Sequence, residues 1–218
     1  MKALKLFAFL LVVAGAALSA KGAWIPAKAW LAGHMLDAAF SEARTVKAPQ
    51  KPWRWADFRV AGELRIKGHK THVLDRATGQ ALAFGAGLHE EHGFPADPVI
   101  LSGHRDTHFK ILETLKEGDT FQLEGLHSTR RYEVIETRIF DLREGSLQMP
   151  PKGHALLITC WPFGALAPNT PKRFLVLAAE VQPGETDATA RTAGWYPPAS
   201  DPAPSRMSQA FPALHPDW

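Results

Sequence analysis

The stretch that decides the fold is ALLITCWP, residues 155–162, a short apolar run that ends at a cysteine and a proline. Proline has no backbone N–H and cannot donate to a β ladder, so a strand through this run must end near Pro162. Cys160 is the single cysteine of the chain. We therefore expect its thiol where a strand gives way to a loop, a common position for reactive side chains.

Similar short runs, apolar or alternating, recur along the chain. They occupy residues 59–66, 72–74, 99–102, 120–123, 130–137 and 174–181. Turn sequences separate several of them, such as KEGD at 116–119 and PPKG at 150–153. Only residues 78–83 and 109–115 are expected to form short helices. Many short strands without long alternating helices indicate an all-β domain, a barrel or a sandwich, which we place at residues 53–182.

The chain before this domain is predicted to contain two helical segments. Residues 1–26 carry Lys2 and Lys5 near their start, continue with an uncharged run over 6–20 and reach Trp24. This pattern is typical of a signal-anchor that crosses a membrane as a helix. A cleaved signal peptide is the alternative, because small residues lie near Ala20. Residues 27–52 are predicted to form an amphipathic helix, with apolar residues at three- and four-residue spacing, and then a linker rich in proline and lysine.

Residues 183–218 form a proline-rich tail with little periodicity, and we expect this tail to be disordered.

Composition excludes several classes of function. The formal net charge of the 218 residues is +3, without a dense block of lysine and arginine, so a nucleic-acid partner is not expected. One cysteine cannot form an intramolecular disulfide or a multi-cysteine metal site. A free thiol is a liability in an oxidising compartment, which suggests that Cys160 has a chemical role if the chain is exported. A small, buried and inert cysteine is the alternative.

Two other reactive side chains stand at the ends of apolar runs. His104 follows the run at 99–102, and Arg173 precedes the run at 174–178. A thiolate attacks a carbonyl, an imidazole moves protons and a guanidinium holds an oxyanion, so the three groups are a complete set for acyl transfer. Spacing alone does not show that they converge, and Arg173 as a surface ion-pair residue remains open.

Three segments resemble the signature blocks of the sortase family: SGHRDTHF at 102–109, TCWPF at 159–163 and PKRFLV at 171–176. They occur in the family's order, and Arg173 follows Cys160 by 13 residues. The resemblance covers residues 53–181. The N-terminal segment and IPAKAWLA at 25–32 are similar to sortases of Gram-negative bacteria, often called class GN.

The resemblance implies a fold and a reaction. The fold would be a closed eight-stranded β-barrel with short helices. Cys160 would attack a secreted protein at a C-terminal sorting signal of the Leu-Pro-x-Thr-Gly kind and form a thioacyl enzyme. His104 would transfer protons, Arg173 would hold the oxyanion, and Thr159 would orient the substrate or Arg173. An amine acceptor, which the sequence does not identify, would then release the product.

The same resemblance bears on cofactors and location. It implies no cofactor and no metal. It also implies a bacterial inner-membrane protein with a single membrane pass, whose catalytic domain lies on the periplasmic side.

Three alternatives stay open. An L,D-transpeptidase-like enzyme also uses cysteine and histidine on a β-rich fold, but its histidine closely precedes its cysteine. A metal hydrolase would use His104 with His108, or the cluster at residues 89–92, although neither has the usual helical zinc spacing. The non-enzymatic alternative is an anchored β-barrel binding module in which Cys160 is buried.

Overall fold

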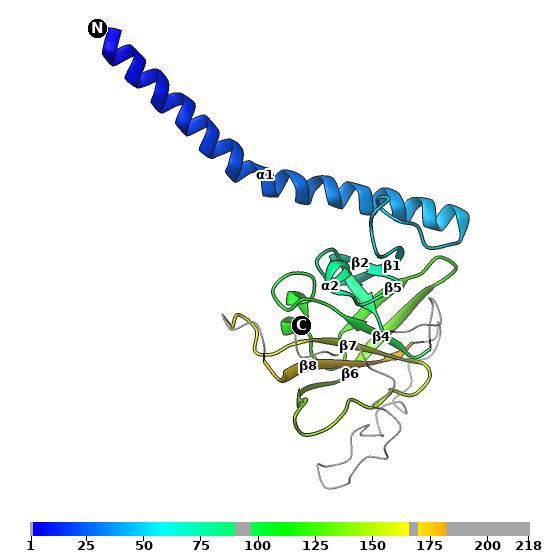
Figure 1. Cartoon of the computed structure of the whole chain (residues 1–218). Coiled ribbons are helices and arrows are strands. Elements are labelled where there is room, and N and C mark those ends of the chain that lie inside the picture. The colour runs from blue at the N-terminus through cyan, green and yellow to red at the C-terminus, as the bar shows by residue number, and fades with distance from the viewer. Residues whose placement is uncertain (1, 90–96, 166–169, 182–218) are drawn as a thin grey trace.

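The computed structural model describes residues 2–89, 97–165 and 170–181. Eight strands form a closed barrel in the order β1-β2-β3-β4-β7-β8-β6-β5 (Figure 1). The strands are β1 (Val60–Ile66), β2 (His69–Leu74), β3 (Ala86–Leu88), β4 (Val99–Ser102), β5 (Thr120–Glu124), β6 (Thr129–Asp141), β7 (His154–Cys160) and β8 (Lys172–Glu180). The helices are α1 (Lys2–Val46), α2 (Gly79–Leu82) and the 3-10 helix η1 (Lys110–Thr114). The predicted closed eight-stranded barrel with short helices is confirmed.

Two strand pairs in the barrel are parallel, β2 with β3 and β4 with β7, and the remaining pairs are antiparallel. In the β4–β7 pair, Val99 lies opposite Ala155 and Ser102 lies opposite Ile158. Because parallel strands point the same way, their carboxyl ends meet at one edge of the sheet. The residues that follow β4 and those at the end of β7 therefore come together at that edge.

Both faces of the sheet around β7 are buried. The larger apolar cluster draws residues from all eight strands and fills the barrel interior, including Ala155 and Leu157 of β7. A second cluster covers the outer face, where Leu156 and Ile158 pack with Leu147 from the segment before β7. A strand buried on both faces loses the alternation of apolar and polar residues, and this explains the continuous run at 155–159.

Helix α1 joins the barrel only through its C-terminal part. Leu36, Ala39, Phe40 and Ala43 are buried against a cluster that includes residues of β1 and β2. Figure 1 shows that the N-terminal part extends away from the barrel and that the helix changes direction near its middle. Pro26 lies inside the helix and removes one backbone hydrogen bond, which is a common cause of such a bend.

The expectations for the two ends of the chain have different outcomes. Among the helices that the structure describes, none has the length and apolar character needed to cross a membrane. The signal-anchor at 1–26 is thus not shown, and it stays a prediction. The proline-rich tail at 183–218 lies outside the described residues.

Candidate active site

The thiol of Cys160 lies at the end of β7, directly opposite Arg173 of β8. The Trp161 N–H donates to the Lys172 carbonyl at 3.0 Å and continues the pairing of the two strands beyond Cys160. Residues directly opposite each other in an antiparallel pair project from the same face, with Cβ atoms about 4.5–5.5 Å apart. The thiol and the guanidinium are therefore neighbours on the outer face of the barrel.

His104 reaches the same edge of the sheet from β4. Gly103 is tied to β7 twice, because its N–H donates to the Ile158 carbonyl at 3.2 Å and its carbonyl accepts from the Thr159 hydroxyl at 2.7 Å. These bonds carry the β4–β7 pairing one residue beyond β4. They place His104, whose side chain is exposed, beside the segment that holds Cys160.

Glycine is needed at position 103. A Cβ atom there would lie 2.6 Å from Cγ of Phe109, a ring that is completely buried. The Phe109 N–H donates to the His104 carbonyl at 3.0 Å and closes the turn that follows β4. Because real Cβ atoms do not approach another carbon so closely, only glycine lets the turn pack onto this ring and present His104 at the surface.

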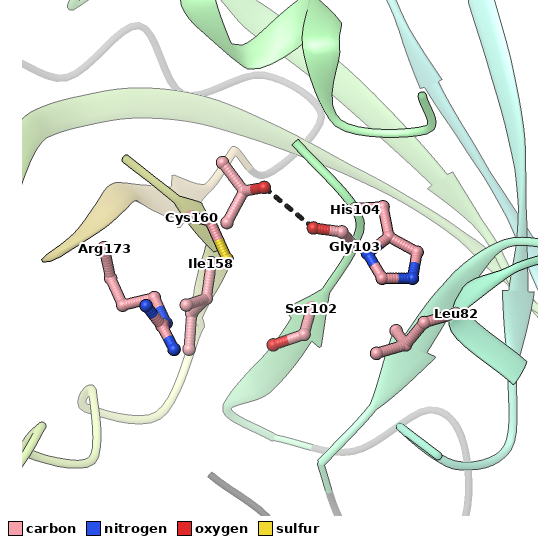
Figure 2. A pocket seen from close by; sticks show the side chains of 8 residues that line it. Leu82, Ser102, Gly103, His104, Ile158, Cys160 and Arg173 are labelled. Atoms are coloured by element: carbon pink, nitrogen blue, oxygen red, sulfur yellow. Dashed lines mark hydrogen bonds between the residues drawn. The ribbon is translucent and has the colours of Figure 1, made fainter. Parts of the chain in front are cut away.

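The three reactive side chains line one small pocket. Its lining residues are Leu82, Ser102, Gly103, His104, Ile158, Thr159, Cys160 and Arg173. In the view of Figure 2, the thiol of Cys160 lies between the guanidinium of Arg173 and the imidazole of His104. Cys160 has intermediate exposure, so it is not the buried cysteine that the binding-module alternative requires. The sequence-predicted residues Cys160, His104 and Arg173 are thus brought together.

Arg173 is held in place by its own strand. Its side chain is only 4% exposed, and Nη1 donates to the carbonyls of Thr170 at 2.6 Å and Lys172 at 3.1 Å. No residue in the described part of the chain accepts a hydrogen bond from its Nε or Nη2. A guanidinium fixed in this way has donors left for an oxygen atom that enters the pocket.

Thr159 lines the same pocket, and its expected role in orienting the substrate or Arg173 stays a prediction. It is only 2% exposed, and its hydroxyl donates to the Gly103 carbonyl at 2.7 Å. Side chains alternate along β7, since neighbouring residues on a strand face opposite sides of the sheet. Thr159 therefore lies on the opposite face from Cys160 and connects β7 to the residue before His104.

A second histidine, His89, lies beside the pocket, whereas the sequence pattern indicated it only as part of a candidate metal cluster at 89–92. Nε2 of His89 lies 2.5 Å from Oγ of Ser102, one of the lining residues. Burial lowers the pKa of His89 to about 4, so its imidazole is neutral near pH 7. The contact depends on β3, in which Leu88 pairs with Leu101 of β4. Strand β3 has only three residues, too few to show a periodic pattern.

Arg105 was also missed, although it directly follows His104. Its side chain is only 6% exposed, and it donates hydrogen bonds to Asp106 and to the carbonyls of Pro162 and Ala165. The hydrogen bond from Arg105 holds the pKa of the Asp106 carboxyl below its ordinary value. No periodic or compositional signal distinguishes this buried arginine from a surface one.

The histidines of the metal-hydrolase alternative make other contacts. Nε2 of His108 lies 3.2 Å from the Ala83 carbonyl, and burial lowers the pKa of His108. Of the cluster at 89–92, only His89 belongs to the described residues. Across residues 2–89, 97–165 and 170–181, no group of three or more histidine, cysteine or acidic side chains is arranged to hold a metal ion.

The barrel and its pocket define a class of protein with a cysteine, a histidine and an arginine at one edge of a closed eight-stranded sheet. Residues 64–181 match the family model of the Sortase domain, and the chain belongs to the sortase family. The match confirms the family, whereas the Gram-negative class stays a prediction.

The individual relatives share less than a third of their aligned residues with this chain. The chain is 29% identical to Sortase D of Bacillus subtilis (strain 168) over 113 residues, which are 50% of this chain and 57% of that protein. It therefore spans little more than half the length of this relative. The pilus-related Sortase C of Group B Streptococcus is 22% identical with a TM-score of 0.48, over 56% of this chain and 68% of that one. Sortase A of Listeria monocytogenes has the same identity and TM-score, over 56% of this chain and 88% of that one.

Proposed function

We propose that this chain is a sortase-type cysteine transpeptidase, which cleaves a C-terminal sorting signal of a secreted protein and transfers the protein to an amine. One observation carries the proposal: Cys160 and Arg173 lie opposite each other across β7 and β8, and His104 joins them in the same pocket. Family membership supports it. The substrate that we propose carries a signal of the Leu-Pro-x-Thr-Gly kind.

The first half of the reaction forms a thioester. The Cys160 sulfur attacks the threonine carbonyl of the signal, and the electron pair of the C=O bond moves to oxygen. The free donors of Arg173 stabilise this oxyanion. When the tetrahedral intermediate collapses, the bond from carbon to the glycine nitrogen breaks, and His104 supplies the proton that the leaving amine needs. Thioacyl-Cys160 remains on the protein.

The second half of the reaction transfers the acyl group. An acceptor amine attacks the thioester carbonyl, and Arg173 again holds the oxyanion. His104 takes the proton that the amine loses as the new amide bond forms, and the Cys160 thiolate leaves. The roles of His104 in the two halves are opposite, so the same imidazole returns to its starting state.

Mass spectrometry of the intact protein tests this function. We expect incubation with a panel of sorting-signal peptides to add the mass of the acyl fragment to the native chain and to release the glycine-containing peptide. Cys160→Ala should give no adduct with any peptide, while His104→Gln should greatly slow its formation. His69→Gln is the matched control, because His69 is an exposed histidine outside the pocket. Peptide cleavage by folded Cys160→Ala would refute the proposal.

A thiol-specific reagent separates the enzyme from a non-catalytic binding module. We expect a methanethiosulfonate to modify Cys160 in the native protein, because this side chain has intermediate exposure. Full protection of the native thiol, with modification only after denaturation, would favour the binding module.

We infer in addition that residues 1–26 hold the enzyme at the bacterial inner membrane and that the barrel faces the periplasm, as in sortases of the Gram-negative class. Several apolar side chains of this segment are exposed, among them Leu6, Phe7, Phe9 and Leu10. Cell fractionation tests the inference, with the full-length chain expected in the membrane fraction. A soluble periplasmic protein that begins near Lys21 would contradict it.

A further inference from the structure

Arg105 is a buried charged residue in the turn that follows β4. It comes directly after His104, but its side chain has only 6% exposure, whereas the side chain of His104 is exposed. A charge that is removed from water is costly unless hydrogen bonds and an opposite charge compensate it. The contacts of Arg105 show where this compensation comes from.

The guanidinium of Arg105 connects the segments of the two catalytic residues. Nη1 donates to the Pro162 carbonyl at 2.8 Å, and Nη2 donates to the Ala165 carbonyl at 2.8 Å. Both acceptors lie just beyond Cys160 along the chain. On the other side of the guanidinium, Nε lies 3.1 and 3.2 Å from the two Asp106 carboxylate oxygens, and Nη2 lies 3.0 Å from one of them.

His104 is therefore flanked by two connections to the segment around Cys160. The residue before it, Gly103, is bonded to Ile158 and Thr159 of β7. The residue after it, Arg105, is bonded to two carbonyls beyond the end of β7. A guanidinium is planar, and its N–H groups point in fixed directions, so two bonds from one such group fix an orientation as well as a distance.

We propose that Arg105 is a positioning residue, which holds the His104 imidazole in register with the Cys160 thiol by connecting the two segments. The proposal rests on the function proposed above. Asp106 has a secondary part: its side chain is 59% exposed, and besides its pair with Arg105 it accepts one backbone hydrogen bond, from Gly164 in the segment beyond Cys160. Small errors in the placement of reacting groups are costly, and a displacement of about 1 Å can reduce a rate about 100-fold.

Three variants and one matched control test the proposal. Arg105→Met keeps the unbranched stem but removes every donor. Arg105→Lys keeps the charge, but a single ammonium cannot reproduce the fork that spans two carbonyls. The matched control is Arg76→Met, since Arg76 also contacts an adjacent aspartate, Asp75, at 3.2 Å but lies outside the pocket. Asp106→Asn leaves both carbonyl bonds of Arg105 in place and keeps an oxygen that can accept from the Gly164 N–H, so it is expected to reduce the rate less than about 3-fold.

The first measurement is steady-state cleavage of a fluorogenic peptide that contains Leu-Pro-Glu-Thr-Gly, with rates expressed per folded protein. We expect Arg105→Met to lower kcat by about 10- to 100-fold, while KM changes less than about 3-fold, because the substrate still enters the same pocket. Arg105→Lys should show a loss of about 10-fold and Arg76→Met none. If Arg105→Met does not fold, the comparison of Arg105→Lys with Arg76→Met decides the matter.

The second measurement needs no substrate. In protein with ¹⁵N-labelled histidine, the His104 ring signals, assigned with His104→Gln, should shift or broaden in Arg105→Met and Arg105→Lys but not in Arg76→Met. Unchanged ring signals, or kcat within about 2-fold of the parent despite changed signals, would overturn the proposal. If the parent protein cleaves no peptide but the ring signals change, the proposed function fails, while the connection from Arg105 to His104 stands.

Discussion

The position of Arg173 is set by strand pairing, which places it opposite Cys160. It pairs with Cys160 across the two strands, is anchored by two carbonyl contacts and lines the pocket. A lysine at this position would keep the positive charge but would lose the planar set of N–H donors of the guanidinium. Loss of one oxyanion donor typically costs about 10²–10³ in turnover, so we expect Arg173→Lys to depress kcat by that order while KM changes little.

Steady-state kinetics with the sorting peptide checks this prediction. Arg143→Lys is a suitable control, because Arg143 is 70% exposed and bonds to Asp141. A rise in KM with kcat intact would make Arg173 a substrate clamp instead of an oxyanion donor.

The buried imidazole of His89 makes stability depend on pH. In the unfolded chain His89 titrates near its ordinary pKa of 6.5, while burial lowers the folded value to about 4. Between these values the unfolded state binds more protons, so the free energy of unfolding falls as the pH falls, by at most about 1.4 kcal/mol per pH unit from this residue. Denaturant titrations across this window should show a smaller slope for His89→Gln.

His72 and His108 also have lowered pKa values, mainly through burial, and they remain in both proteins. The difference between the two slopes therefore isolates His89. Parallel pH profiles for the parent and His89→Gln would show that His89 titrates normally in the folded protein.

The sequence indicated which residues stand at strand ends, but it did not indicate which contacts those residues make. Cys160 and His104 are visible because each ends an apolar run, and Arg173 because it begins one. The direction of the Thr159 hydroxyl was not predictable, because it depends on the face that β7 presents. The burial of Arg105 depends on carbonyls about 60 residues further along the chain, and no local pattern reports such a contact.

Among the elements, α1 allows apolar burial to be compared with ion pairing. Phe40 is buried in the contact with the barrel, whereas Arg44, one turn later, forms an ion pair with Glu124 at 2.8 Å and is 57% exposed. Removal of a buried phenylalanine side chain costs about 3–5 kcal/mol. An exposed ion pair contributes about 0–1 kcal/mol. We expect Phe40→Ala to lower the free energy of unfolding several times more than Arg44→Gln does.

Equilibrium denaturation of the two variants checks the comparison. A larger loss for Arg44→Gln would mean that charge, and not apolar contact, holds α1 on the barrel.

Strand existence could be predicted for most of the barrel, but strand limits could not. Strand β6 extends to Asp141, well beyond the expected 130–137, because β8 pairs with it along its whole second half. Strand β2 begins at His69 because it pairs with β1 there, although its first residues are polar. Pairing partners set these limits, and they are distant in the sequence. The long helix α1 was foreseen only as two separate segments.

At the scale of the whole molecule, every strand that closes the barrel lies between Val60 and Glu180. In the described part of the chain, the strand contact nearest the C-terminus is the Val181 N–H donating to the Arg131 carbonyl at 2.8 Å. A chain that stops after Gln182 keeps all of these contacts. We expect its free energy of unfolding to stay within about 0.5 kcal/mol of the parent value, and its rate of peptide cleavage to stay within a few-fold.

Thermal denaturation and peptide kinetics on the shortened chain check this prediction. A large drop in either quantity would show that residues after 182 support the barrel.

The position of β8 in the barrel has a consequence for protein synthesis. It is the last strand of the described chain, yet it lies between β6 and β7 and pairs with both. Translation proceeds from the N-terminus, so β7 emerges from the ribosome with the thiol before its neighbour exists. Arg173 arrives on the strand that completes the sheet. A nascent or prematurely terminated chain therefore carries the Cys160 thiol without the Arg173 guanidinium. For the mechanism that we propose, we expect such a chain to form no thioester until translation has passed β8.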